Sequence, residues 1–198
     1  MNNTNSLLEI NNLILKKYGN QDIIKKIWKN RILSILHYDL EDRAGTKLGE
    51  AFLSFPGLSK FVVNDASGSE VMHIERAGMH AGLHVVIRDP FTFYDPAGEE
   101  LGTMQRKLAT FFGREEFWVE KDGVEFMRIY VDSSERNYKM QVRGFQVASA
   151  YKHIRAFRPE QLEISITGGV DHRVVIGALI VIEFVNATRR ETSSYSRD

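Results

Sequence analysis

Apolar and polar residues alternate with a period of two along much of this chain. Residues 138–142 read YKMQV and residues 162–166 read LEISI, with every second residue apolar. Successive side chains of a strand point to opposite faces, so this pattern predicts strands with one buried face and one face in water.

Turn signals separate these predicted strands at regular intervals. In the segment FWVEKDGVEFMRIYV, Asp122 and Gly123 stand between two alternating runs, and this dipeptide suits the positive φ angles of a tight hairpin turn. The pattern therefore predicts a series of antiparallel hairpins. Their turns are expected at 42–45, 65–68, 95–98, 122–123 and Gly144.

The strands also form an internal repeat. The series YDLEDRAGTKLGEA and KFVVNDASGSEVMHI matches FYDPAGEELGTMQ and EFWVEKDGVEFMRI, and both copies contain Gly-x-x-Leu-Gly. A weaker third copy runs from YKMQVRGFQVASAYKHI through LEISI. The chain is therefore expected to be a stack of similar β units, each of about four strands.

The longest apolar run, 174–185, breaks this pattern because it does not alternate. A membrane span needs roughly 20 apolar residues, whereas this run would extend only about 18 Å as a helix and includes Glu183. Its valines and isoleucines also suit a buried strand, but the run is long for one, and Asp171 could cap a helix that starts just after it.

A helix that is apolar on every side must be buried on every side. Closing a sheet into a barrel removes its exposed edges, and a barrel of more than about eight strands leaves interior space. We therefore expect a mainly β (α+β) fold in which this helix fills a closed antiparallel barrel. The predicted core positions of the helix are Val174, Val175, Ile176, Leu179, Ile180 and Ile182.

The N-terminal region has a different pattern. In DIIKKIWKNRILSIL, the isoleucines and Trp28 share one helical face and the lysines share another, which predicts a short amphipathic helix or a helix that runs into a strand from Ile32. We expect one domain over 1–198, with residues 1–31 as an N-terminal extension and 187–198 as a polar, frayed tail.

Composition excludes several classes of function. The 198 residues carry no net charge, so no overall basic field favours nucleic acid, and no cysteine is present for disulfides, thiolate zinc sites or iron–sulfur clusters. The first residues lack the pattern of a secretory signal. These features predict a cytoplasmic protein.

Sequence motifs give no support for catalysis. The chain contains no Gly-x-Ser-x-Gly, Walker A or dinucleotide-binding motif. His73, His80 and His84 form a cluster, but Gly78 and Gly82 indicate a loop there, and no carboxylate follows with zincin spacing. We predict a protein that is not an enzyme and has neither a cofactor nor a metal.

Two basic groups are candidates for binding anionic lipid. The first is on the predicted amphipathic helix beside Trp28, and the second flanks Phe111 and Phe112. The alternative is that the isoleucines and phenylalanines pack on the barrel and leave the cations in water. The candidate residues are Lys25, Lys26, Lys29, Arg106, Lys107 and Arg114.

The series FYDPAGEELGTMQRKL, EFWVEKDGVEFMRI, GFQVASAYKHI and GVDHRVVIGALIVIEF resembles the LURP-one-related and phospholipid-scramblase-like proteins, over about residues 32 to 186. The resemblance implies the tubby C-terminal fold, a closed antiparallel barrel of about twelve strands around a hydrophobic C-terminal helix. That helix corresponds to 174–185 in this chain.

Functions differ among these relatives, and the resemblance implies a barrel without a catalytic signature. Scramblase-like calcium binding would need several carboxylates before the helix, where this chain has only Asp171, and the cysteines of a palmitoylation segment are missing. We predict a non-enzymatic module that binds anionic phospholipid, a phosphoinositide or a membrane surface peripherally. The alternatives are a protein-interaction scaffold without a lipid ligand and, less favoured, scramblase-like lipid transfer.

Overall fold

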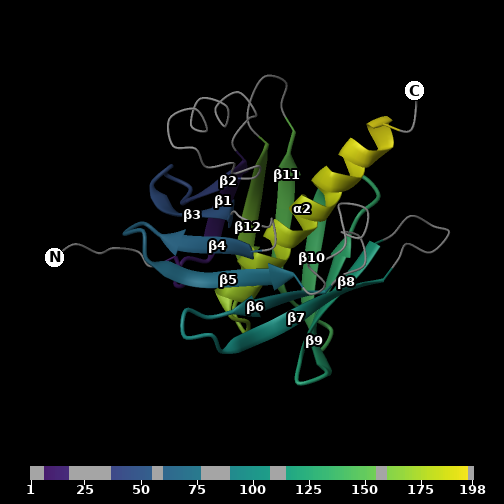
Figure 1. The fold of residues 1–198 in the computed structure, drawn as a ribbon, viewed down its shortest axis with the longest axis horizontal. Helices are drawn as coiled ribbons and strands as arrows, with labels where there is room; N and C mark the ends of the chain where they lie inside the picture. The colour runs from purple at the N-terminus through teal and green to yellow at the C-terminus, as the bar shows by residue number, and fades with distance from the viewer. Residues whose placement is uncertain are drawn as a thin grey trace.

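The computed structural model describes residues 7–17, 37–54, 60–76, 90–107, 115–154 and 160–195. Within them, twelve strands close into one antiparallel barrel around a helix, which confirms the predicted fold class (Figure 1). The strands are β1 (Asn12–Lys17), β2 (His37–Glu41), β3 (Lys47–Ser54), β4 (Lys60–Asp65), β5 (Glu70–Arg76), β6 (Phe91–Tyr94), β7 (Glu100–Lys107), β8 (Glu115–Lys121), β9 (Val124–Val131), β10 (Asn137–Val142), β11 (Phe145–His153) and β12 (Gln161–Ile166).

Each strand pairs with its neighbours in sequence, and β1 closes the barrel between β2 and β12. Leu15 of β1 is opposite Leu40 of β2 on one side and Leu162 of β12 on the other. All three leucines are buried, so the alternation of apolar residues turns one face of each strand toward the common core.

β1 corrects one predicted boundary. It lies within residues 1–31, the predicted N-terminal extension, and its residues 12–17 are part of the wall. The segment NLILKK is too short to show its period clearly, and only the pairing with β2 and β12 reveals its place. The predicted amphipathic helix lies outside the described residues.

Most of the predicted turns share one hydrogen-bond arrangement. The carboxylates of Asp42, Asp65 and Asp95 accept the backbone N–H four residues later, at 2.8 to 3.0 Å, and a glycine with positive φ follows each aspartate by three residues. Asp132 makes the same turn, which the sequence did not predict because Glu135, with φ of 54°, stands in place of the glycine.

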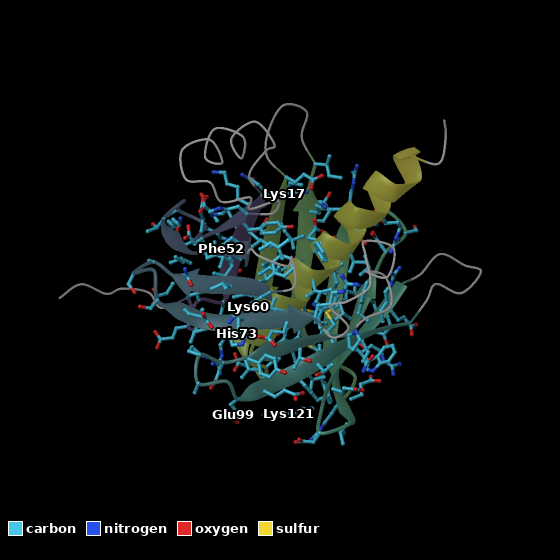
Figure 2. All side chains as sticks on the ribbon, in the orientation of Figure 1. Lys17, Phe52, Lys60, His73, Glu99 and Lys121 are labelled. Carbon is cyan, nitrogen blue, oxygen red and sulfur yellow. The ribbon has the colours of Figure 1, made fainter. Side chains whose placement is uncertain are left out.

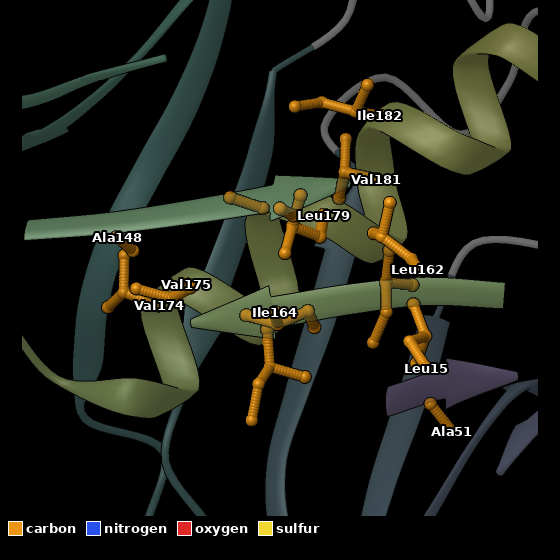
Figure 3. Packing of buried hydrophobic residues seen from close by; sticks show 14 of the residues in the cluster. Leu15, Ala51, Ala148, Leu162, Ile164, Val174, Val175, Leu179, Val181 and Ile182 are labelled. Carbon is orange, nitrogen blue, oxygen red and sulfur yellow. The ribbon is translucent and has the colours of Figure 1, made fainter. Parts of the chain in front are cut away.

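Helix α2 (His172–Tyr195) crosses the barrel interior (Figure 1). Asp171 caps its first turn, since its side chain accepts the N–H of Arg173 at 2.9 Å. The six predicted core positions are at most 1% exposed. Figure 3 shows Val174 and Val175 beside Ala148, and Leu179 among buried side chains of the wall. Within the described residues, no helix has both the length and the hydropathy of a membrane span.

The helix also corrects the prediction of a frayed tail, because it continues from Val185 to Tyr195. An ion pair supports this extension: Arg189 lies 3.7 Å from Glu135, in the turn between β9 and β10. The sequence showed only a polar composition here, and a contact between residues so far apart cannot be inferred from composition.

Candidate functional site

The two ends of the barrel differ in the length of their connections. At one end, here called the turn end, short described turns join the strands at 42–46, 66–69, 95–99, 122–123 and 143–144. At the other, the loop end, the connections include 18–36, 77–90 and 108–114. Helix α2 enters at the turn end and leaves at the loop end (Figure 1). One end of a rigid scaffold commonly positions binding residues, so the described strand ends at the loop end are the candidate site.

On four strands, the row of buried, inward-facing residues is followed by a basic residue at this end of the barrel. Lys17, Arg76, Arg106 and Lys152 each stand two positions beyond a buried residue of the same strand, namely Leu15, Ile74, Met104 and Ala150. Residues two apart in a strand share a face, so these cations follow the inward-facing rows to the opening of the barrel. We call this layer the mouth; Figure 2 shows Lys17 at this end and Glu99 and Lys121 at the turn end.

Arg106 was predicted from the sequence as a lipid-binding candidate, and the structure places it in the mouth. Its Cζ atom lies 5.7 Å from the ring centroid of the buried Phe117, which is opposite it on β8. This is the geometry of a cation–π contact. The guanidinium is thus held against the buried aromatic ring of Phe117.

The structure does not describe the side chains of the other lipid-binding candidates. Lys107 is the last residue of β7, and only its backbone is described. Lys25, Lys26, Lys29 and Arg114 lie outside the described residues. The lipid-binding role of these residues stays a prediction.

A buried ion network joins α2 to the wall below the mouth. Lys152, 2% exposed, forms a salt bridge with Glu183 of the helix, which is 5% exposed, and a second bridge of 3.3 Å with Glu160. The Tyr138 hydroxyl donates to the other Glu183 oxygen at 2.6 Å. These partners explain how a carboxylate is accommodated within the apolar run.

Tyr38 and the same network line a cavity of about 10 Å³, close to the smallest that can hold one water molecule. Burial raises the pKa of the Tyr38 hydroxyl well above its ordinary value, and the negative charges of Glu183 and Glu160 raise it further. The hydroxyl therefore stays protonated at neutral pH. The cavity is lined by Leu15, Lys17, Tyr38, Lys152, Glu160, Gln161, Leu162 and Glu183.

The chemistry of the mouth is electrostatic. Of the side chains described in this layer and in the network below it, four are basic and two are carboxylates, Glu160 and Glu183. Lys152 is paired with both of those carboxylates. Lys17, Arg76 and Arg106 are the other basic residues of this layer. Such an arrangement suits an anion at the opening of the barrel.

Other residues considered from the sequence have structural partners. Both oxygens of Asp171 accept from the Arg173 guanidinium, at 3.1 and 2.7 Å, and one of them also caps the helix by accepting the Arg173 backbone N–H. His73 is bonded to Glu70 at 2.6 Å and stacks on Tyr94. His80 and His84 lie outside the described residues.

The sequence did not single out Arg76 and Lys152, and it showed Lys17 only as part of a cationic N-terminal segment. A usable signal was present, because each continues a series of alternating apolar residues at the inward-facing position. No local sequence pattern, however, indicated that the ends of β1, β5, β7 and β11 meet around one opening.

Comparison with known proteins adds a family and a fold. A family model described as LURP-one-related matches residues 26–183. A crystal structure of a protein from Arabidopsis thaliana aligns with a TM-score of 0.55 and 16% identity, covering 88% of this chain and 91% of that one. A search of curated proteins finds no match. At this identity the structural likeness shows the fold alone.

Proposed function

This chain is a member of the LURP-one-related family, and from that premise we propose that it is a non-catalytic barrel module that binds anionic lipid head groups reversibly at its mouth. The observation that carries this proposal is the inward-facing layer of Lys17, Arg76 and Arg106 at the loop end. The protein would act at the cytoplasmic surface of a membrane, as a peripheral component.

The surroundings of the mouth support binding of a phosphate. The floor beneath Arg106 is apolar, since Phe117 and Met104 are buried, and a charge interaction beside apolar groups is less screened than one in open water. Arginine can hold a phosphate through two parallel hydrogen bonds. The chain as a whole has no net charge, so attraction to a membrane must come from a local cluster of this kind.

Co-sedimentation with vesicles tests the proposal. We expect the full chain to bind vesicles that contain phosphatidylserine or a phosphoinositide at low salt, and to bind less at high salt. A triple variant, Lys17→Gln, Arg76→Gln and Arg106→Gln, should bind roughly one hundredfold more weakly, because each basic residue near an anionic surface contributes about 1 kcal/mol.

A matched control removes the same number of positive charges at other positions. Lys121→Gln, Lys139→Gln and Arg143→Gln alter residues of the turn end and the outer wall, so this triple variant should bind as the wild type does. Equal losses in both triple variants would show attraction by overall charge alone. Absence of vesicle binding at low salt by the wild-type chain would contradict the proposal.

Exposed apolar residues at the turn end favour a second candidate function, a scaffold for a protein partner. Val124 is 66% exposed and Phe145 is 77% exposed, and Val124 borders a groove of about 390 Å³ that also includes Leu101 and Phe126. An exposed apolar patch can serve as an interaction site for a protein partner. A stoichiometric partner that is recovered without lipid, and lost in the double variant Val124→Ser and Phe145→Ser, would support this function.

A further inference from the structure

A second cluster of polar side chains lies on the outer face of β2 and β3, away from the mouth. Tyr38 and Leu40 face the core, so His37 and Asp39 face outward, and Asp39 is opposite Glu50 in the register of the two strands. Despite this position, His37 is only 9% exposed and Asp39 only 6%. Buried carboxylates need a cation or several hydrogen-bond donors.

The three side chains converge on one point. The Nε2 atom of His37 lies 3.4 Å from a Glu50 oxygen and 4.0 Å from an Asp39 oxygen. One ligand atom from each residue can be chosen so that all lie within 4.8 Å of one another. The cluster therefore offers one imidazole nitrogen and two carboxylate oxygens to a common centre.

Lys47 at present supplies a positive charge to this cluster. Its Nζ atom lies 2.9 Å from Asp39 and 2.8 Å from Glu50. Partial burial by itself would lower the pKa of Lys47, but the hydrogen bonds to Glu50 and Asp39 outweigh it and raise this pKa, so the ammonium stays charged. The position of this ammonium shows that the cluster accepts a cation between Asp39 and Glu50.

We propose that His37, Asp39 and Glu50 form a zinc site in which the metal ion exchanges with the ammonium of Lys47. Bonds of about 2.0 to 2.2 Å from zinc to nitrogen and oxygen place neighbouring ligands of a tetrahedron about 3.4 Å apart. The separation of His37 from Glu50 already has this value, and the separation from Asp39 requires only a small side-chain movement. Three protein ligands leave the fourth position for water.

Lys47 can leave the cluster because its side chain is 47% exposed. Rotation about its flexible stem would move the ammonium into water at little cost, while both carboxylates remain to hold the metal. The imidazole favours zinc over magnesium or calcium, which prefer oxygen ligands alone.

Calorimetric titration of the chelator-treated full chain with Zn²⁺ tests this site. We expect one ion per chain in the wild type. His37→Phe, which keeps a ring beside Phe52, should lose at least about tenfold in affinity, as removal of a ligand requires. Lys47→Met should bind Zn²⁺ about tenfold more tightly, because the competing ammonium is gone.

His73→Phe is the matched control. His73 is also on an outer face between two glutamates, but Glu70 lies at its Nδ1 atom, 2.6 Å away, and Glu75 at its Nε2 atom, 3.8 Å away. Opposite ring nitrogens cannot chelate a single ion, so this variant should bind Zn²⁺ as the wild type does.

Two further measurements keep the proposal testable if His37→Phe fails to fold. Glu50→Gln changes a less buried ligand and should also weaken binding, and Co²⁺ bound to the wild type should show the intense visible absorption of a four-coordinate site. Lack of stoichiometric Zn²⁺ binding by both the wild type and Lys47→Met would overturn the site. So would equal affinities of His37→Phe and His73→Phe.

Discussion

At the scale of the residue, the Gly-x-x-Leu-Gly motif combines two separate requirements for glycine. Its first glycine, Gly45 or Gly98, has a positive φ of 82° or 85° in a turn, with open space around it. Its second, Gly49, allows close approach of β4, because a Cβ atom there would lie 2.2 Å from the carbonyl oxygen of Asn64. The second glycine of the motif, Gly49, therefore stands where the backbone of the neighbouring strand β4 passes close by.

Gly49→Ala and Gly45→Ala should therefore differ in their effect on stability. We expect Gly45→Ala to lower the free energy of unfolding by about 1 kcal/mol, since only backbone strain opposes alanine there. Gly49→Ala should lower it by about 3 kcal/mol or more, because a backbone oxygen must move. Urea unfolding of both variants measures the difference, and equal losses would contradict the close approach of β4.

At the scale of the element, a buried ion pair joins the apolar helix α2 to the barrel wall. Its side chains from Val174 to Ile182 are buried and apolar, whereas Glu183 has specific partners in Lys152 and Tyr138. The cost of burying Glu183 without these partners disfavours other rotations and depths of the helix in the barrel.

Lys152→Met should consequently lower the free energy of unfolding by about 3–5 kcal/mol, because it leaves Glu183 buried without its cation. The double variant Lys152→Met and Glu183→Gln should recover most of this loss, since glutamine is neutral and can still accept from Tyr138. Thermal or urea unfolding of the single and double variants gives the free energies of unfolding for this double-mutant cycle.

The exposed pair of Arg128 and Glu125, 2.8 Å apart, serves as the comparison for this cycle. Arg128→Met should cost less than about 1 kcal/mol, because water solvates the remaining carboxylate. A similar small cost for Lys152→Met would mean that Glu183 is not enclosed as the structure shows.

At the scale of the whole molecule, wall and helix depend on each other. A closed barrel of twelve strands has an interior too wide for its own side chains to fill, and a helix that is apolar on all sides has no stable place in water. The buried side chains of both form one continuous core. The barrel and α2 should therefore fold and unfold as one unit.

Ile180→Asp should unfold the entire domain. Ile180 is fully buried in α2, and an unpaired carboxylate there costs several kcal/mol, a large part of the stability of a domain. Val124→Asp, at an exposed position of the turn end, is the control and should change stability by less than about 0.5 kcal/mol. A soluble Ile180→Asp variant with cooperative unfolding would contradict the enclosed helix.

Local patterns in the sequence were sufficient to predict several of these features. The alternation of 138–142 and 162–166, the aspartate turns and the apolar run of 174–185 predicted hairpins, a closed barrel and its core helix, because side-chain direction and turn geometry depend on near neighbours. The turn at Asp132 and the strand β1 were missed, since Glu135 replaces a glycine and NLILKK is short.

By itself, then, the sequence determined which residues face the core and which connections turn tightly. Only the tertiary structure decided which of those residues meet. Barrel closure and strand register bring Lys17, Arg76, Arg106 and Lys152 to one opening, join Lys152 to Glu183, and gather His37, Asp39 and Glu50 on one outer face. The physical reason is that inward or outward direction follows a local period of two, whereas proximity between distant strands depends on the pairing of the whole sheet.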